Sequence, residues 1–130
     1  MAGYAHRNLK DVEDAAPKFG MSPPLEARFA REELELERSG VSYQRLDPGS
    51  RVPFGHKHGE QEELYVVVGG SGRMKLDNEV LDLREWEAVR VSPDVTRCLE
   101  SGEEGIEVVV FGAPNTGGGD VEMEPGWWSD

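Results

Sequence analysis

The chain has 130 residues, which is enough for one domain with a hydrophobic core of its own. It carries 26 acidic and 14 basic residues, a formal net charge of −12, so we expect it to bind neither nucleic acids nor anionic membranes. A single cysteine excludes an internal disulfide and favours the reducing cytoplasm as the location. We expect no signal peptide and no membrane-spanning helix, because the N-terminus is polar and the longest apolar runs have the length of strands.

Residues 1–40 are expected to form an N-terminal arm that packs on the domain that follows. Residues 1–24 are polar and interrupted by prolines, which indicates an irregular segment with one helical turn between Leu9 and Ala15. The charged run from Ala30 to Glu37 predicts a short helix, and Ser39-Gly40 would end it.

Residues 41–113 have the pattern of an all-β domain. Short apolar runs are separated by turn residues such as Asp47-Pro48-Gly49. The expected strands are 41–46, 64–68, 73–76, 80–83, 88–91, 95–99 and 106–111. The segment Gly69-Gly70-Ser71-Gly72 is expected to be a turn between two of these strands. Short strands at such intervals indicate a sandwich or a barrel.

Residues 114–130 are expected to be a Gly-rich linker followed by a tail. The segment 113–119 has the composition of a flexible linker. The tail carries Trp127 and Trp128, which we expect to dock on the barrel or on a partner subunit. A lid over the barrel mouth is the alternative role for these two rings.

The clearest chemical signal is the pair His56 and His58, followed by Glu63. Residues two apart lie on the same side of an extended strand, so both imidazoles face one way. Two imidazoles and a carboxylate are ligands for borderline divalent metals such as Zn, Fe, Mn, Ni or Cu. Only one of the adjacent residues Glu62 and Glu63 can point inward, and Glu62 is the minor alternative as a ligand.

This stretch resembles the first motif of the cupin superfamily, G-x5-H-x-H-x3,4-E-x6-G. Its spaced positions are occupied here by His56, His58, Glu63 and Gly70. Six residues separate Gly49 from His56, where the motif has five. The resemblance covers about residues 41–113. It implies a cupin-type jelly-roll β-barrel, also called a double-stranded β-helix, with the arm and the tail flanking it.

The second cupin motif, G-x5-P-x-G-x2-H-x3-N, is degenerate in this chain. Its best register starts at Trp86. In this register Ser92 stands at the proline position, Asp94 at the glycine, Arg97 at the histidine and Ser101 at the asparagine. The resemblance implies a third imidazole ligand at the position of Arg97. A register shifted by one residue would put Cys98 there instead, as a thiolate ligand.

Arg97 determines how such a site behaves. A guanidinium stays protonated, has no lone pair to offer a metal, and repels a divalent cation at short range. Three arrangements remain open. Arg97 turns outward and leaves a three-ligand site, or it pairs with Glu63 in place of a metal, or it holds an anionic ligand at the mouth of the pocket.

Strand parity around Glu63 makes a further prediction. If Glu63 points into the barrel, Tyr65 does so too, and the apolar side chains between them point out. The outward side chains are Leu64, Val66 and Val68. A strand that is apolar on both faces is covered on both, so we expect a homodimer, with the arm or the tail as competing covers.

Together these patterns predict a small-molecule-binding cupin with a weak or incomplete site for Zn, Fe, Mn or Ni. The metal ligands would be His56, His58 and Glu63. Tyr65 and Arg97 would line the pocket of the small molecule. If Arg97 binds this molecule directly, we expect it to be an anion. One alternative is a metal-dependent enzyme of the dioxygenase or isomerase type. Another is a non-catalytic structural dimer with a vestigial site. The fold does not decide between them.

Overall fold

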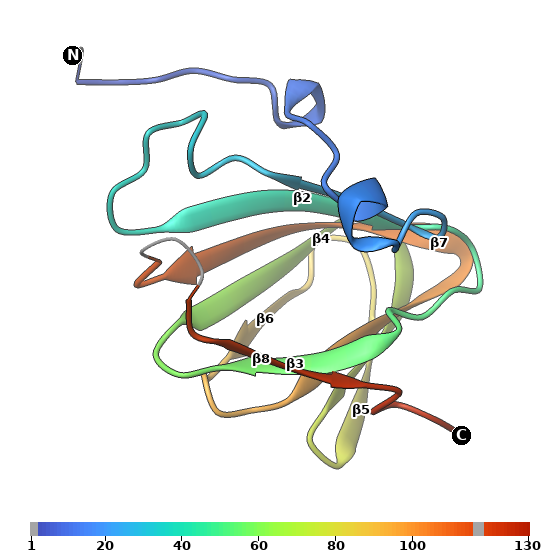
Figure 1. The fold of residues 1–130 in the computed structure, drawn as a ribbon. Helices are drawn as coiled ribbons and strands as arrows, with labels where there is room; N and C mark the ends of the chain where they lie inside the picture. The colour runs from blue at the N-terminus through green and yellow to red at the C-terminus, as the bar shows by residue number, and fades with distance from the viewer. Residues whose placement is uncertain (1–2, 116–118) are drawn as a thin grey trace.

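The computed structural model describes residues 3–115 and 119–130, whose regular secondary structure is almost entirely β-strand (Figure 1). Two short 3-10 turns come first, η1 (Leu9–Asp11) and η2 (Ala16–Phe19). The strands that follow are β1 (Leu25–Phe29), β2 (Gly40–Leu46), β3 (Phe54–His58), β4 (Glu62–Leu76), β5 (Glu79–Leu83), β6 (Ala88–Val91), β7 (Arg97–Ala113) and β8 (Val121–Pro125). Within the described ranges no helix is long and apolar enough to cross a membrane.

The strands form one curled antiparallel sheet organised around β4 and β7. These two long strands pair with each other, and β4 also pairs with β5 and β6. β7 pairs in addition with β2 and β3, which in turn pair with β1 and β8. Figure 1 shows the result, with β2 on one side of the barrel and β3 with β8 on the other. This confirms the expected all-β barrel.

The expected turn at residues 69–72 is wrong, because this segment lies inside β4. The ladder with β7 is irregular there, between Val67 and Gly69 and again between Gly70 and Gly72. Gly70 has φ 70°, and a Cβ on it would collide with the carbonyl of Gly105 on β7. The glycines therefore allow two backbones to approach closely and the strand to bend, instead of reversing the chain.

The expected helix between Ala30 and Glu37 is also wrong, since this segment consists of turns. Glu35 has φ 55°, which interrupts helical geometry. Like charges four residues apart, at Glu33 and Glu37, would also oppose a helix. Regular structure instead occurs in both flanking segments as strands, β1 before residue 41 and β8 after residue 114.

The core lies inside the barrel and follows the alternation of side chains along β4. Tyr65 and Val67 are buried, whereas Leu64 between Glu63 and Tyr65 is 38% exposed. The inward residues of β4 pack with further buried side chains, among them Leu46, Met74, Ile106, Val108 and Val110. The parity expected from the sequence is therefore present.

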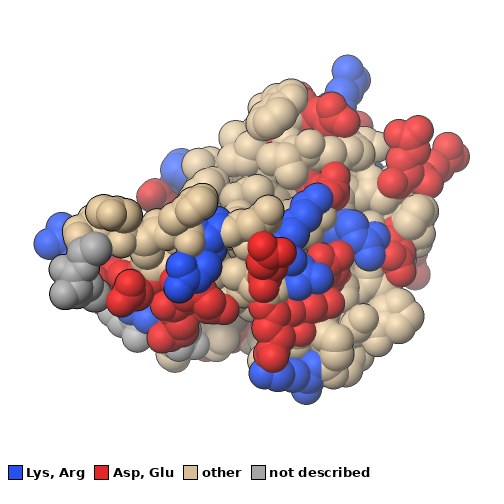
Figure 2. Space-filling view, turned by 90° about the horizontal axis from the view of Figure 1, so that it is seen from above, with Lys and Arg blue, Asp and Glu red and all other residues tan. Residues whose placement is uncertain are grey.

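Charged side chains of β1 and β2 pair with one another on the outside of the barrel. Glu26 accepts hydrogen bonds from Arg28 Nε at 2.7 Å and from Arg45 Nε at 3.0 Å. Figure 2 shows Lys and Arg side chains lying against Asp and Glu side chains on the face seen from above. Although the chain has a net charge of −12, acidic and basic side chains are interspersed on this face.

The C-terminal tail docks on the outer surface of the barrel. The Trp128 ring lies between Arg51 and Arg73, whose guanidinium carbons are 4.2 Å and 5.3 Å from the ring centroid. Lys75 Nζ lies 4.5 Å from the centroid of Trp127. These cation–π contacts hold both rings against the barrel, and neither ring lines its cavity.

Candidate metal and ligand site

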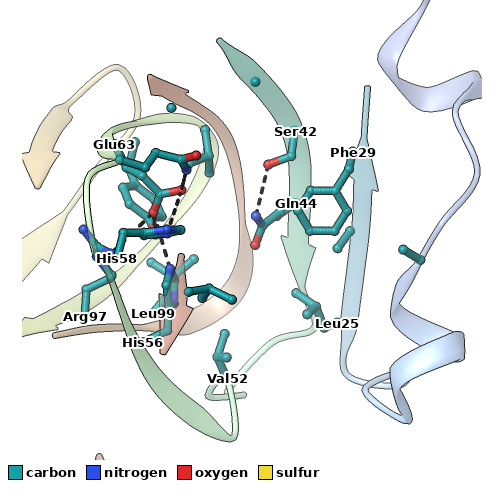
Figure 3. Close-up of a pocket in the computed structure, with 18 of the residues that line it drawn as sticks. Leu25, Phe29, Ser42, Gln44, Val52, His56, His58, Glu63, Arg97 and Leu99 are labelled. Atoms are coloured by element: carbon teal, nitrogen blue, oxygen red, sulfur yellow. Dashed lines mark hydrogen bonds and ion pairs between the residues drawn. The ribbon is translucent and has the colours of Figure 1, made fainter. Parts of the chain in front are cut away.

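The candidate site is assembled by three strands. β3 supplies His56 and His58 on one face, and Glu63, the second residue of β4, points inward. β7 supplies Arg97, which is the Cα partner of His56 in the ladder between β3 and β7. Figure 3 shows these four side chains converging on one side of a cavity.

The three expected ligand side chains lie close together. Their ligand atoms are all within 4.8 Å of one another. His56 Nε2 is 3.4 Å from Glu63 Oε1, and His58 Nε2 is 3.5 Å from Glu63 Oε2. The two imidazole rings stand nearly perpendicular, at 84° with centroids 5.2 Å apart. Glu62 is exposed and does not belong to this group.

Neighbouring side chains fix the Glu63 carboxylate. Tyr65 donates its hydroxyl to Oε1 at 2.9 Å, and Gln61 donates from Nε2 to Oε2 at 3.0 Å. Burial alone would raise the pKa of Glu63, but its contacts with His56 and His58 outweigh burial and hold the pKa well below 4.5. The group is therefore a carboxylate at neutral pH, fixed for use as a ligand.

Asp120, in the tail, orients His58. Its Oδ1 lies 2.9 Å from His58 Nδ1, while Oδ2 accepts the backbone N–H groups of Glu60 and Gln61 at 2.9 Å and 3.0 Å. In the neutral ring this contact places the hydrogen on Nδ1 and leaves the Nε2 lone pair facing Glu63. His58 Nε2 is buried and has no hydrogen-bond partner among the described residues.

The sequence alone did not point to Asp120 or Gln61 as parts of the site. Asp120 is 62 residues from His58 and reaches it through the pairing of β8 with β3. Gln61 carries no ligand chemistry of its own, and its role depends on the turn that follows β3. Neither residue belongs to the motif spacing, so no local pattern could have shown them.

Arg97 points into the barrel and is 1% exposed. Its Nη2 donates to the Ser92 carbonyl at 3.1 Å, and its Nη1 lies 3.8 Å from Glu63 Oε1. Nε and Nη1 make no hydrogen bond within the described part of the chain. Of the three arrangements left open by the sequence, the outward one is excluded.

Cys98 alternates with Arg97 along β7 and lies outside the ligand group. Its Sγ donates to the Val52 carbonyl at 3.2 Å, and burial raises the pKa of the thiol to about 11. The ligand atoms of His56, His58 and Glu63 converge without this thiol, and Arg97 is the ladder partner of His56, so the structure follows the register with Arg97 at the third-ligand position.

A cavity of about 710 Å³ extends from the site into the barrel. Figure 3 shows its polar end on one side, with Phe29, Ser42 and Gln44 on the other and Leu25 and Val52 below. The N-terminal arm contributes to its wall through Ala16, Phe19 and Met21. The volume is in the range of roughly 300–1,000 Å³ that small-molecule sites occupy.

No family model matches the sequence. Among solved structures, a cupin protein from Bacteroides fragilis superposes with a TM-score of 0.72 at 22% identity, over 92% of this chain and 89% of that one. The chain has the cupin fold. Oxalate decarboxylase from Bacillus subtilis matches this chain with a TM-score of 0.76 at 17% identity, over 95% of the chain but 33% of the enzyme.

A sequence relative gives no further information on activity. An uncharacterized protein from Methanocaldococcus jannaschii is 28% identical over 78 residues, which cover 55% of this chain. The match spans 62% of that protein, less than two thirds of its length. At such identities the shared property is the fold, and the chemistry has to be argued from the residues of the site.

Proposed function

We propose that this cupin binds a small organic molecule inside its barrel, at a divalent metal ion held weakly by His56, His58 and Glu63. The observation that carries the proposal is His58, whose Nδ1 is held by Asp120 while its buried Nε2 has no hydrogen bond. Without a metal ion, Nε2 has only a long contact of 3.5 Å with Glu63 Oε2, whereas an ion would bind the lone pair of the neutral ring directly. The carboxylate–histidine pair is the usual support of a metal-binding imidazole.

Arg97 is the reason to expect weak binding. Two imidazoles and one carboxylate fit Zn, Fe, Mn or Ni and leave positions open for a ligand. The charge of Arg97 cancels that of Glu63, whose Oε1 is 3.8 Å from Nη1, so only the more distant Asp120 behind His58 offers the cation a net negative charge. When bound, the ion would supply a Lewis acid that polarises an oxygen of the ligand.

The protein's own residues have separate parts in this function. Asp120 keeps His58 in one tautomer, and Tyr65 and Gln61 hold Glu63 in one orientation. The apolar walls of the cavity lower the local dielectric constant at the polar end, which strengthens the electrostatic contacts there. This arrangement does not define a reaction step. The proposed function is therefore the binding of a small molecule.

Metal titration of protein purified without an affinity tag tests the proposal. We expect calorimetry with Mn, Fe, Ni and Zn to show binding that His58→Ala abolishes and Arg97→His strengthens, because that change removes a charge and adds a lone pair. The matched control is His6→Ala, which changes the exposed histidine outside the site. Absence of binding in both the original protein and Arg97→His would overturn the metal site.

A metal-free binding module is the second candidate, favoured by the contact between Arg97 and Glu63. In this case the ion pair takes the place of the metal, and Gln61 and Tyr65 complete the environment of the carboxylate. The same titration separates the two candidates, since only the first requires the protein to bind metal. Elemental analysis before titration gives an independent answer.

We also propose a cellular location and an oligomeric state for this protein. The cytoplasm fits a chain whose one cysteine is a buried free thiol. A homodimer fits the apolar outer side of β4, where Leu64 is 38% exposed.

A further inference from the structure

The wall of the cavity differs in character from the polar end that carries the candidate metal ligands. Aliphatic, thioether and aromatic groups supply most of this wall, among them Met21, Leu25, Phe29, Val52, Met74 and Leu99. They come from the N-terminal arm, β1, β4 and β7 and the segment before β3, so the apolar surface surrounds the space from several sides. A molecule filling the cavity therefore places its body against hydrocarbon.

Polar side chains on the wall are largely occupied with one another. Gln44 Nε2 donates to Ser42 Oγ at 3.1 Å. The amide of Gln61 donates to Glu63 at 3.0 Å and accepts from Asn115 at 2.8 Å. A ligand rich in hydroxyls would leave much of its own hydrogen-bonding capacity unmet here, which is costly in an apolar site.

The polar end of the cavity, unlike the apolar wall, favours a charged group of the ligand once a metal ion is present. The charges of Glu63 and Arg97 cancel, because Nη1 of the buried guanidinium lies 3.8 Å from the carboxylate. Asp120 behind His58 adds one negative charge, so one of the two positive charges of a divalent ion would remain uncompensated in a low-dielectric interior. A negatively charged group of the ligand is the natural compensation.

We infer that the ligand is an amphipathic organic anion, with an apolar body against the cavity wall and one carboxylate-type head at the polar end. The assignment of the head rests on the proposed function, whereas that of the body rests on the wall alone. At about 710 Å³ the cavity accommodates a body of several carbon atoms.

The test uses a homologous series of probes on the full-length protein, with and without the metal that binds best. Hexanoate, octanoate and decanoate are titrated by calorimetry beside the matching primary alcohols, and glucuronate serves as a polar anion. We expect affinity to rise roughly fourfold for each added methylene, from about 0.8 kcal/mol for each one buried. The acids should bind more tightly than the alcohols when metal is present.

A variant separates binding in the cavity from adsorption to the surface. Phe29→Ser changes a cavity-lining ring that is partly exposed, so the fold tolerates it, and it should weaken decanoate binding while leaving metal affinity unchanged. Tyr4→Ser is the matched control, because Tyr4 is exposed and does not line the cavity.

Each outcome decides one part of the inference. Affinity that does not change with chain length, or glucuronate binding as tight as decanoate binding, overturns the apolar body. Acids and alcohols of equal affinity on the metal-loaded protein overturn the anionic head. If no metal binds at all, the proposed function and the head fail together, and the chain-length dependence of the alcohols still decides the body.

Discussion

Arg97 places a positive charge in the interior of the barrel, beside the Glu63 carboxylate. Two of its nitrogen atoms, Nε and Nη1, lack hydrogen bonds in the described structure. An unsatisfied buried donor costs about 1–3 kcal/mol, so the arrangement is not one that packing alone would favour. Substitution of the third-ligand position was evident in the sequence, but the direction of the side chain was not. That direction depends on the Ser92 carbonyl and on Glu63, which only the folded barrel brings together.

Trp86 is strained at the residue that begins the second motif, where cupins have glycine. Its φ is 69°, a left-handed conformation that costs a side chain about 1–2 kcal/mol, and the ring is 74% exposed. We expect Trp86→Gly to raise the free energy of unfolding by about 1 kcal/mol. Urea denaturation measures it. Trp86→Ala is the control, since it removes the ring and keeps the strain, and equal stability of the two variants would contradict the prediction.

His58 predicts a pH dependence of the metal-free protein. Burial alone would lower the pKa of His58, but the carboxylates of Glu63 and Asp120 outweigh burial and raise the pKa above 6.5. A raised pKa means that the folded state holds the proton more tightly than the unfolded state. The stabilisation is complete below pH 6.5 and is lost as the pH rises through the folded-state pKa.

Urea denaturation at pH values from about 5.5 to 8.5 measures this effect. The free energy of unfolding should fall across the upper part of that range. His58→Gln should flatten the fall, whereas His6→Gln should leave it unchanged, because His6 is exposed. An unchanged fall in His58→Gln would assign the pH dependence to other groups.

At the level of elements, the pairing of β8 with β3 connects the tail to the site. Val121 is the partner of His58 in this ladder, and Asp120 immediately before it contacts the imidazole. Motif spacing identified His56, His58 and Glu63, because all three belong to two consecutive strands. It could not identify Asp120, whose position depends on a strand pairing across many residues. The glycines of β4 were misread for a related reason, since their role depends on β7 and not on their neighbours in sequence.

Asp120→Asn should weaken metal binding roughly 10- to 100-fold, the usual effect of losing the group that orients a ligand histidine. The amide cannot offer the same charge to Nδ1–H, so His58 loses its preferred orientation. Calorimetric titration of the variant measures the change. Glu122→Gln is the matched control in the same tail, because Glu122 is largely exposed and pairs only with Lys57 at 3.8 Å among the described residues. Equal losses in both variants would indicate a general effect of tail charge.

For the whole molecule, the outer side of the sheet raises the question of assembly. Leu64 on β4 and Phe111 on β7 are ladder partners, and their side chains are 38% and 44% exposed. Trp127 and Trp128 dock elsewhere, against Lys75, Arg51 and Arg73. The described parts of the arm and the tail thus leave these two side chains uncovered, which makes a second subunit the expected cover.

We expect light scattering to show a homodimer that Leu64→Glu converts to a monomer, because the new charge would be buried at the interface. Val80→Glu is the matched control on β5, since Val80 is similarly exposed but lies away from the pair of Leu64 and Phe111. Circular dichroism of both variants verifies that the barrel is intact. A monomeric unmodified protein would contradict the prediction.

The position of Asp120 bears on how such a barrel can be inherited or transplanted. A gene segment that stops at Pro114 would encode His56, His58, Glu63 and Arg97, and it would retain the whole recognisable motif region. It would lack the residue that orients His58 and the strand that carries it. A fusion or duplication made at that boundary would transmit the signature of the site without its support, because the residues that build the site extend beyond the motif region.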